Sequence, residues 1–465
     1  MNQWLGRDLT PIGRNTVLKS LILPKLNHLF STLPNPTDVI VKDLNNLCFK
    51  FVWKNKPDKI SRNEITKSYQ EGGLRVPNVK NTLISQKIAW IKRLIHKDNG
   101  EKMKQLFHQN ITQNCEDYHL KSRRYIEDNI VTPRTNQFWI DVLRAWGQFV
   151  STKGSNIKNA NDILSQPIWW NESIIIDKHE ISYKHYIRHG IRFVNDLIDD
   201  TGNFLNYEEF TNLYKIKTNF LEYAGMINSI KKYIKNQNVN VLIKLTNPIL
   251  PYFIEEILKP IKGCRVFYDV LENSTRVKVF KYRKKWEKDL EMYICDNEWL
   301  EINDIPFSSH LDTKKIWFQY SIIHRILPLN DLLFKMKLIE TNQCSFCNNS
   351  AETITHIFYD CLVVQNIWEK LKTWIEMKTE SHLAFTKRNI CLGYPERRNR
   401  VLNHIISTVK YSIYIARIKG DQPQLHLITQ DLKNMYNIDK SILYTNCQQS
   451  KFMKFWSVCH NLFTD

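Results

Sequence analysis

Glycine and proline are both scarce in this sequence. Only 13 of the 465 residues are Gly and 15 are Pro, whereas Gly alone makes up about 7% of an average protein. β-Sandwiches with many turns and glycine-rich phosphate-binding loops need glycine where the backbone takes unusual conformations, so this composition argues against both. The chain is instead rich in Lys, Leu, Ile and Asn, and a mainly α-helical fold with more than one domain is predicted.

Long hydrophobic stretches are also missing. No run of about 18 uncharged apolar residues occurs, so no membrane span is expected. Residues 1–8 have no apolar stretch of the kind found in a signal peptide, and we expect a cytoplasmic or nuclear protein that is not secreted. Its cysteines are then reduced. Seven of the 10 Cys are scattered along the chain and are interpreted as small buried residues, whereas three are clustered.

The motifs of common catalytic sites are absent as well. There is no nucleophile elbow, Walker loop or dinucleotide-binding fingerprint. Asp199 and Asp200 form the only adjacent aspartate pair, a pattern that polymerases use on a hairpin to hold two metal ions. Here Thr201, Gly202 and Asn203 follow, which is typical of a turn. A calcium loop would place Leu197 in the first ligand position, where it cannot coordinate. We therefore expect no catalytic residues.

Basic residues outnumber acidic ones, and their excess is uneven. The formal net charge is +19, which makes a polyanion the expected partner. Residues 1–110 carry a net charge of +11, residues 151–260 carry +1, and residues 381–430 carry +6. The positive charge therefore lies mainly towards the two ends of the chain.

Apolar spacing predicts two helices in the first 110 residues. The first begins near Thr37 and ends before a basic turn at residues 54–59, and its apolar face comprises Ile40, Leu44, Leu47, Cys48 and Phe51. Gly72 and Gly73 then interrupt the helical pattern. The second helix has Ile84, Ile88, Ile91 and Ile95 on one face, with Lys87, Lys92 and Arg93 on or beside the other. Such a basic face is either solvated or binds nucleic acid.

The rest of the chain follows the same helical pattern. Residues 96–130 are polar and predicted to form a linker or a loose helix, and Trp139, Trp146 and Phe149 are predicted to lie on a buried helical face. Residues 276–288 combine basic and aromatic side chains, which suits contacts to a nucleic-acid strand. Acidic residues are interspersed in this segment and reduce its net positive charge, so whether it binds nucleic acid is left open. A final helix over residues 402–416 is predicted to end at Gly420.

One cluster has the spacing of a metal site. Cys344, Cys347, His356 and Cys361 follow the pattern C-x2-C-x8-H-x4-C, and three Cys with one His are a common ligand set for structural Zn²⁺. No carboxylate or open position is implied, so a catalytic zinc is not predicted. The alternative is three buried cysteines and a surface histidine. Residues 341–380 have a net charge of −2, so the zinc is expected to stabilise a small helical subdomain and not to bind phosphate.

Short stretches spread along the chain form a familiar pattern. In the N-terminal segment they are Trp4, Arg7-Asp8-Leu9-Thr10, Gly13-Arg14, Val17-Leu18-Lys19-Ser20, Leu23-Pro24-Lys25-Leu26-Asn27, Phe51-Val52-Trp53-Lys54-Asn55-Lys56-Pro57 and Gly72-Gly73-Leu74-Arg75-Val76-Pro77-Asn78. The pattern continues through Ala89-Trp90, Phe138-Trp139, Gly190-Ile191 and His324-Arg325 to the cysteine cluster. With these residues, the N-terminal segment resembles the region that follows the polymerase palm in LINE-type (non-LTR) retrotransposon reverse transcriptases.

This resemblance implies a domain order. Residues 1–110 would be a helical thumb, residues 131–300 a helical C-terminal domain, residues 301–380 a zinc-binding module, and residues 381–465 a helical tail. Met1 falls about where the palm of the family ends, so the endonuclease, fingers and palm have no counterpart here. The chain is then expected to be a non-catalytic C-terminal part of such an enzyme, either left by a degraded element or cut short as a gene model.

The resemblance also implies partners. A thumb grips the template–primer duplex, so RNA or an RNA–DNA duplex is the expected ligand, with zinc as a structural cofactor. The residues expected to contact nucleic acid are Arg14, Lys19, Lys54, Lys56, Arg75, Lys92 and Arg93. The alternative is a zinc-stabilised protein-interaction domain that binds no nucleic acid, which the mildly acidic zinc segment favours.

Overall fold

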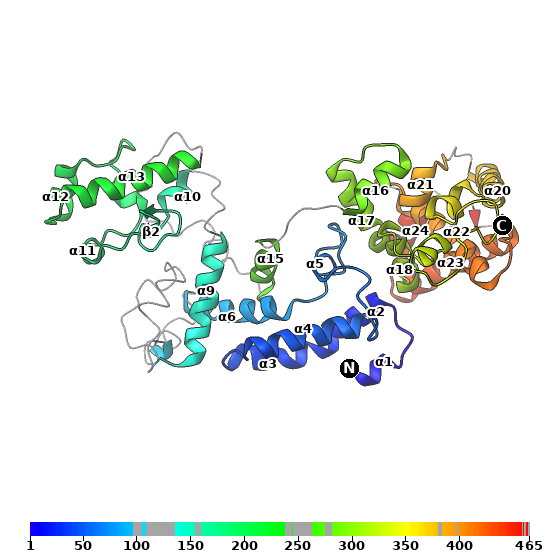
Figure 1. Ribbon diagram of the computed structural model, residues 1–465, viewed down its shortest axis with the longest axis horizontal. Helices are drawn as coiled ribbons and strands as arrows, with labels where there is room; N and C mark the ends of the chain where they lie inside the picture. The colour runs from blue at the N-terminus through cyan, green and yellow to red at the C-terminus, as the bar shows by residue number, and fades with distance from the viewer. Residues whose placement is uncertain are drawn as a thin grey trace. The chain divides into compact units, whose positions relative to one another are not determined.

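The chain divides into two compact units. Unit 1 comprises Met1–Ile22, Asn46–Pro77 and Lys278–Asp465, and unit 2 comprises Leu23–Asn45 and Asn78–Val277. The computed structural model (Figure 1) describes residues 1–95, 105–107, 135–153, 160–237, 244, 263–274, 281–379, 384–396, 399–457, 459 and 462–463. Unit 1 thus gathers three segments that lie far apart in the sequence.

The mainly helical fold predicted from composition is confirmed. The helical elements of unit 1 are α1 (Asn2–Leu5), α2 (Pro11–Val17), the π-helix η1 (Leu18–Ile22), α5 (Arg62–Ile65), α16 (Lys281–Leu290), α17 (Asp296–Ser309), α18 (Thr313–Ile323), α19 (Asn330–Lys335), the π-helix η6 (His356–Asp360), α20 (Leu362–Thr379), α21 (Lys387–Leu392), α22 (Arg400–Lys419), α23 (Leu425–Thr445) and α24 (Gln449–Trp456). Helix α4 (Asp38–Val52) spans the boundary between the units.

Where the structure describes unit 2, its regular elements are helices and one short hairpin. Its elements are α3 (Pro24–Thr32), α6 (Val79–Ile95), α9 (Gln137–Lys153), α10 (Ala160–Leu164), β1 (Ile175–Ile176), β2 (His179–Glu180), α11 (Lys184–Arg188), the 3₁₀-helix η5 (Val194–Leu197), α12 (Tyr207–Tyr214), α13 (Phe220–Asn236) and α15 (Arg265–Ser274). Strands β1 and β2 pair antiparallel, with Ile175 opposite Glu180.

Helices α6, α9 and α15 pack together in unit 2. The predicted apolar faces are buried there, since Ile88, Ile91 and Trp146 have no exposed surface. The prediction was wrong for Lys87, which is also fully buried. Its ammonium donates to the carbonyl oxygen of Leu33, just after α3. The partial negative charge at a helix C-terminus attracts a cation, which explains why a basic residue faces inwards here.

Unit 1 is built around one continuous apolar core. Helices α16 to α18 and α20 to α24 bury side chains in this core, from Trp286 on α16 to Leu462 near the C-terminus. Helix α22 carries the predicted apolar face, and it ends at Gly420 with a left-handed φ of 78°, the conformation that favours glycine after a helix. The zinc cluster borders the same core, because Cys344 and Cys361 belong to it.

A turn at Gly72 and Gly73 docks the N-terminal segment onto helices α17 and α18. The hydroxyl of Tyr320 donates to the carbonyl oxygen of Gly72 at 2.8 Å. A Cβ atom on Gly73 would lie 2.1 Å from the carbonyl oxygen of Lys67, so no larger residue fits. The amide of Asn303 on α17 donates to the Gln70 carbonyl at 3.1 Å. The interruption predicted at this pair of glycines is therefore a tightly anchored turn.

Aromatic contacts reinforce this docking. Tyr69 stacks on Phe307 with 3.8 Å between the ring centroids. Trp53, at the end of α4, meets Trp317 edge to face at 6.0 Å. Aromatic pairs with this geometry add about 0.5–1.5 kcal/mol each beyond the area they bury. Residues 46–77 are thus an integral part of unit 1.

The segments expected from the sequence do not coincide with these units. Residues 1–110 are divided between unit 1 and unit 2, whereas the expected zinc module and C-terminal tail share unit 1 with residues 46–77. On α4, Ile40 and Leu47 are 48% and 49% exposed, so the predicted apolar face is only partly buried. The linker predicted over residues 96–130 lies outside the described residues, except for 105–107. Among the described helices, none combines the length and apolarity that crossing a bilayer requires.

Candidate metal centre

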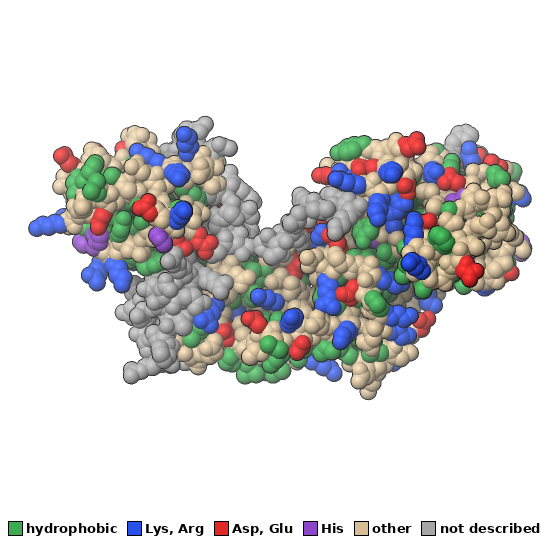
Figure 2. Space-filling model, in the orientation of Figure 1, with side chains coloured by type: hydrophobic (Ala, Val, Ile, Leu, Met, Phe, Trp, Pro, Cys, Tyr) green, Lys and Arg blue, Asp and Glu red, His purple; other side chains and the backbone are tan. Residues whose placement is uncertain are grey.

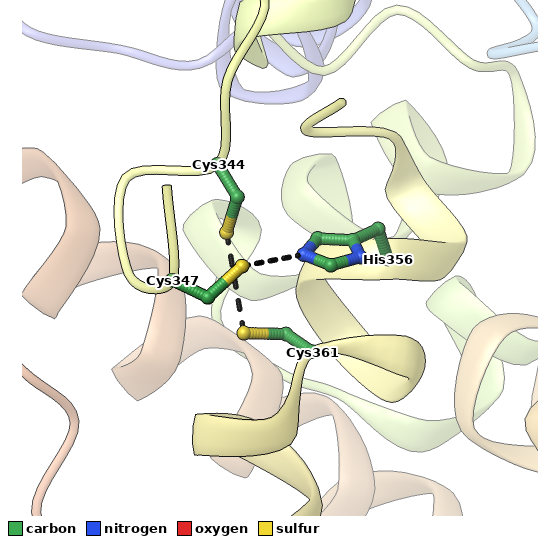
Figure 3. A group of neighbouring side chains, drawn as sticks. All are labelled: Cys344, Cys347, His356 and Cys361. Atoms are coloured by element: carbon green, nitrogen blue, oxygen red, sulfur yellow. Dashed lines mark hydrogen bonds between the residues drawn. The ribbon is translucent and has the colours of Figure 1, made fainter. Parts of the chain in front are cut away.

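The four predicted ligand residues come together in unit 1. Their ligand atoms, three Sγ and one imidazole nitrogen, all lie within 4.8 Å of one another (Figure 3). The sulfurs of Cys344 and Cys361 are 4.0 Å apart, and Cys347 Sγ lies 3.3 Å from Nε2 of His356. Tetrahedral Zn²⁺ with bonds of about 2.0–2.3 Å separates its ligand atoms by roughly 3.5–3.8 Å. The donor set and its spacing therefore fit a zinc ion.

The first two ligands lie on a tight loop, residues 343–351, which we call the metal loop. An antiparallel bridge between Gln343 and Ala351 closes it, and Cys344 N–H donates to the carbonyl of Ser350 at 2.8 Å. Asn348 turns the chain back with a left-handed φ of 56°, a conformation that asparagine tolerates. The backbone N–H of Phe346 points at the Cys344 sulfur at 3.5 Å, which stabilises a thiolate there.

A π-helical turn positions the other two ligands. His356 begins η6 and Cys361 follows its last residue. The N–H of Cys361 donates to the His356 carbonyl at 2.8 Å, which is the i→i+5 bond of a π-helix. In an α-helix, positions five apart are rotated by roughly 140° from each other. The wider turn brings both side chains to the same side, as a shared ion requires.

Burial sets the protonation of these groups. Desolvation raises the pKa of Cys344 to about 12 and lowers the pKa of His356 below its ordinary value. It also raises the pKa of Cys361, although the backbone N–H groups of Val363 and Val364 at the start of α20 oppose this shift. A neutral imidazole is ready to coordinate, whereas the buried thiols become thiolates only when a cation replaces their protons. The centre is thus a Cys3His cluster able to hold a structural zinc ion.

The group that holds the metal loop in place has no signature in the sequence. Glu352 is fully buried and accepts hydrogen bonds from Ser345, in the loop, and from Arg417 on α22. No sequence pattern links these residues, because Arg417 lies 65 positions after Glu352. A charged residue on a helix face usually indicates solvent exposure.

Five of the residues predicted to contact nucleic acid belong to unit 1: Arg14, Lys19, Lys54, Lys56 and Arg75. Lys54, Lys56 and Arg75 are exposed. The guanidinium of Arg75 lies 4.6 Å from the ring centroid of Tyr69. Arg14, in contrast, is 6% exposed and donates to the carbonyl of Val52 at 3.1 Å. This burial gives Arg14 a structural role in joining α2 to α4.

The remaining two residues of that prediction lie in unit 2. Arg93 is exposed, and its guanidinium covers the Trp90 ring at 4.6 Å. Lys92 is half-buried, and desolvation lowers its pKa. The structure therefore divides the predicted nucleic-acid contacts between the two units.

Two other sequence motifs have plain structural roles. Asp199 Oδ1 accepts hydrogen bonds from the backbone of Thr201 and Asn203, both at 2.9 Å, so this segment is a turn, as predicted. In the basic run, Trp286 is buried, and its Nε1 donates to the carbonyl of Ile323 at 2.9 Å. Residues 276–280 of that run lie outside the described part of the chain.

Comparison with known families agrees with this geometry. A family model described as zinc-binding in reverse transcriptase matches residues 280–368. The match extends from α16 into α20 and includes all four ligand residues of the cluster. Residues 280–368 are therefore a zinc-binding module related to that of reverse transcriptases.

Proposed function

We propose that this chain binds RNA or an RNA–DNA duplex through its phosphate backbone, as a non-catalytic C-terminal part of a LINE-type reverse transcriptase. Zinc stabilises the fold, and a basic segment of the same compact unit makes the contacts. This assignment combines the matched zinc module with the resemblance of the N-terminal residues to a polymerase thumb.

One observation carries the proposal: a basic segment is fixed to the unit that contains the zinc cluster. Residues 46–77 contain seven Lys or Arg and three Asp or Glu, and they belong to unit 1 together with the metal centre. The contacts of Tyr69 and Gly72 with α17 and α18 hold this segment in place. A rigid array of cations binds a polyanion more tightly than a mobile one because less entropy is lost on binding.

The exposed turn after α4 is the best-defined part of this surface. All of residues 54–59 are exposed, and Lys54 projects from a backbone with a left-handed φ of 54°. Partial desolvation and, secondly, the charge of Lys56 lower the pKa of Lys59, so the two ammonium groups of this turn repel each other. A phosphate placed between them would relieve this repulsion.

Acidic side chains limit what this surface can do. Figure 2 shows Lys and Arg side chains near α17 and α18 with Asp and Glu interspersed. Arg62 is already paired with Asp58 at 2.8 Å. Such a surface suits contacts with a phosphate backbone and offers little for reading base sequence.

Salt dependence tests the proposal. Binding of the full chain to a labelled RNA–DNA duplex, followed by fluorescence anisotropy, should weaken steeply as salt rises because bound counterions are released. The double variant Lys54→Ala/Lys56→Ala should flatten the slope of log K against log salt by about 1.8 if each lysine meets one phosphate. Lys178→Ala is the matched control, since Lys178 is also an exposed turn residue with a left-handed φ of 69°. Absence of binding at low salt would refute the proposal.

We propose further that this chain does not polymerise DNA by itself. Among the described residues, the group of possible metal ligands that the structure brings together is the Cys3His cluster, whose thiolates suit a structural ion and not a pair of catalytic Mg²⁺ ions. A primer-extension assay on the zinc-loaded chain should show no incorporation. Incorporation that survives repurification would overturn this part of the proposal.

An alternative is a protein-interaction domain stabilised by zinc. Apolar side chains are exposed on and just after α19, with Phe334, Met336 and Leu338 45%, 58% and 64% exposed. Exposed apolar side chains of this kind favour a protein partner. The anisotropy experiment separates the two functions, because this alternative predicts no affinity for the duplex at any salt concentration.

A further inference from the structure

A single buried carboxylate holds the metal loop from outside the ligand set. Both oxygens of Glu352 are engaged, and its side chain has no exposed surface. Oε2 accepts from the backbone N–H and the hydroxyl of Ser345, at 2.8 and 2.6 Å. Oε1 accepts from the backbone N–H of Asn330 at 2.9 Å and from Nε of Arg417 at 2.6 Å. Four donors fix this carboxylate, and Ser345 directly follows the first ligand.

Arg417 closes the network from helix α22. Its Nη2 donates to Oδ1 of Asn330 at 2.7 Å, and the amide nitrogen of Asn330 donates to the carbonyl of Gln343 at 2.7 Å. Arg417 thus grips two groups that each touch the metal loop. It lies well beyond residues 280–368, the segment that matches the family model.

The charges in this region explain why the arginine is needed. Zn²⁺ with three thiolates and a neutral imidazole carries a net charge of −1. Glu352 adds a second negative charge at the metal loop, because its carboxylate accepts the backbone N–H of Ser345, the residue directly after Cys344, at 2.8 Å. A buried anion beside an anionic centre is strongly unfavourable unless a cation pairs with it. The side chain of Arg417, 11% exposed, supplies that cation.

We propose that Arg417 is a positioning residue of the metal centre. Through Glu352 and Asn330 it sets the metal loop in the geometry that binds zinc, and its charge offsets the buried carboxylate beside the anionic centre. This role is independent of nucleic-acid binding. It extends the functional zinc module along the chain as far as α22.

Zinc affinity tests the role directly. The full chain and its variants would compete with a chromophoric chelator for Zn²⁺, and Co²⁺ loading would report the ligand geometry through its visible absorption. Removal of a group that orients a metal ligand typically weakens binding about 10–100-fold. Arg417→Met should fall in this range and alter the Co²⁺ spectrum. The zinc affinity of Arg417→Lys should lie between those of the wild type and Arg417→Met. The lysine ammonium keeps the positive charge but cannot bond to both Glu352 and Asn330 as the planar guanidinium does.

Arg388→Met is the matched control. Arg388 also makes a part-buried ion pair in unit 1, with Glu298. Its other hydrogen bonds go to Asn389 and to the carbonyl of Gly393, which both lie outside the metal loop. Arg388→Met should lower the free energy of unfolding of unit 1 without changing the affinity for zinc. The proposal is overturned if Arg417→Lys and Arg417→Met bind zinc like the wild type, or if Arg388→Met weakens binding as much as they do. If Arg417→Met does not fold, Arg417→Lys carries the same comparison.

A double variant separates geometry from charge. Glu352→Gln with Arg417→Met removes both charges at once, so the carboxylate no longer opposes the anionic centre. It should bind zinc more tightly than Arg417→Met alone. Affinity no better than that of the single variant would refute the electrostatic part of the proposal.

Discussion

Replacement of His324 by Phe should make unit 1 less sensitive to acid. His324 is 3% exposed, and its ring lies 4.0 Å from that of Tyr320 and 5.0 Å from that of Tyr282, between centroids. Burial lowers the pKa of His324 from 6.5 to about 3. A phenyl ring keeps the packing against both tyrosines but cannot take up a proton.

The magnitude follows from proton linkage. Because the folded chain holds His324 neutral while the unfolded chain protonates it below pH 6.5, stability is complete above that pH and falls as the pH drops. This difference in pKa between the folded and unfolded chain lowers the free energy of unfolding by about 1.4 kcal/mol between roughly pH 7.5 and pH 5.5. Below pH 5.5 it lowers it by about 1.4 kcal/mol more per pH unit. The wild type should therefore lose this much more stability than His324→Phe, which keeps the other buried histidines of unit 1, His310 and His404.

Urea unfolding followed by tryptophan fluorescence provides the measurement. Unfolding would be monitored in excess zinc, and the transition that shifts on chelation would be assigned to unit 1, since the two units need not unfold together. The difference in unfolding free energy between His324→Phe and the wild type should change by about 1.4 kcal/mol over this pH range. His426→Phe, at an exposed position, is the control. Parallel pH profiles for the wild type and His324→Phe would refute the reasoning.

Three further predictions concern stability. Atomic absorption should find one zinc per chain. A chelator should lower the melting temperature of unit 1, because zinc binding contributes directly to folding. A chain that stays folded without metal would contradict this prediction. Gly73→Ala should lower the free energy of unfolding by about 2 kcal/mol or more, since its Cβ atom would meet a backbone oxygen at 2.1 Å. The control is Gly6→Ala, whose Cβ atom would have no neighbour within 4 Å and which should not change thermal melts. Lys87→Met leaves the Leu33 carbonyl without its donor and should destabilise unit 2 by about 1–3 kcal/mol in urea unfolding, whereas the exposed Lys80→Met should not.

Local patterns in the sequence were enough to predict the metal ligands. The spacing of Cys344 and Cys347 requires only one tight turn, and His356 and Cys361 lie on a single helical turn. Metal ligation restricts residue type and spacing strongly, so these positions can be identified without knowledge of the fold. The π-helical form of the second turn was not predicted, because it depends on how η6 packs against the core.

Long-range contacts, in contrast, could not be predicted from the sequence. The bond between Tyr320 and Gly72 joins residues 248 positions apart, and no periodicity indicates which helix a turn will meet. Lys87 was assigned to a basic outer face because charged residues are usually exposed. Its burial depends on a carbonyl at the end of another helix. The pairing of Arg417 with Glu352 could not be predicted for the same reason, since only the folded chain brings these two residues together.

The three-part construction of unit 1 has a consequence for synthesis on the ribosome. The segment around Gly72 is made well before Tyr320, to which it docks 248 residues later in the chain. At roughly 5–20 residues per second, this interval lasts about 12–50 s. During that time Trp53, which is buried in the finished fold, lacks its partner Trp317 on α18 and is open to wrong associations. Correct assembly of unit 1 therefore depends on this early segment remaining available until α17 and α18 have been made.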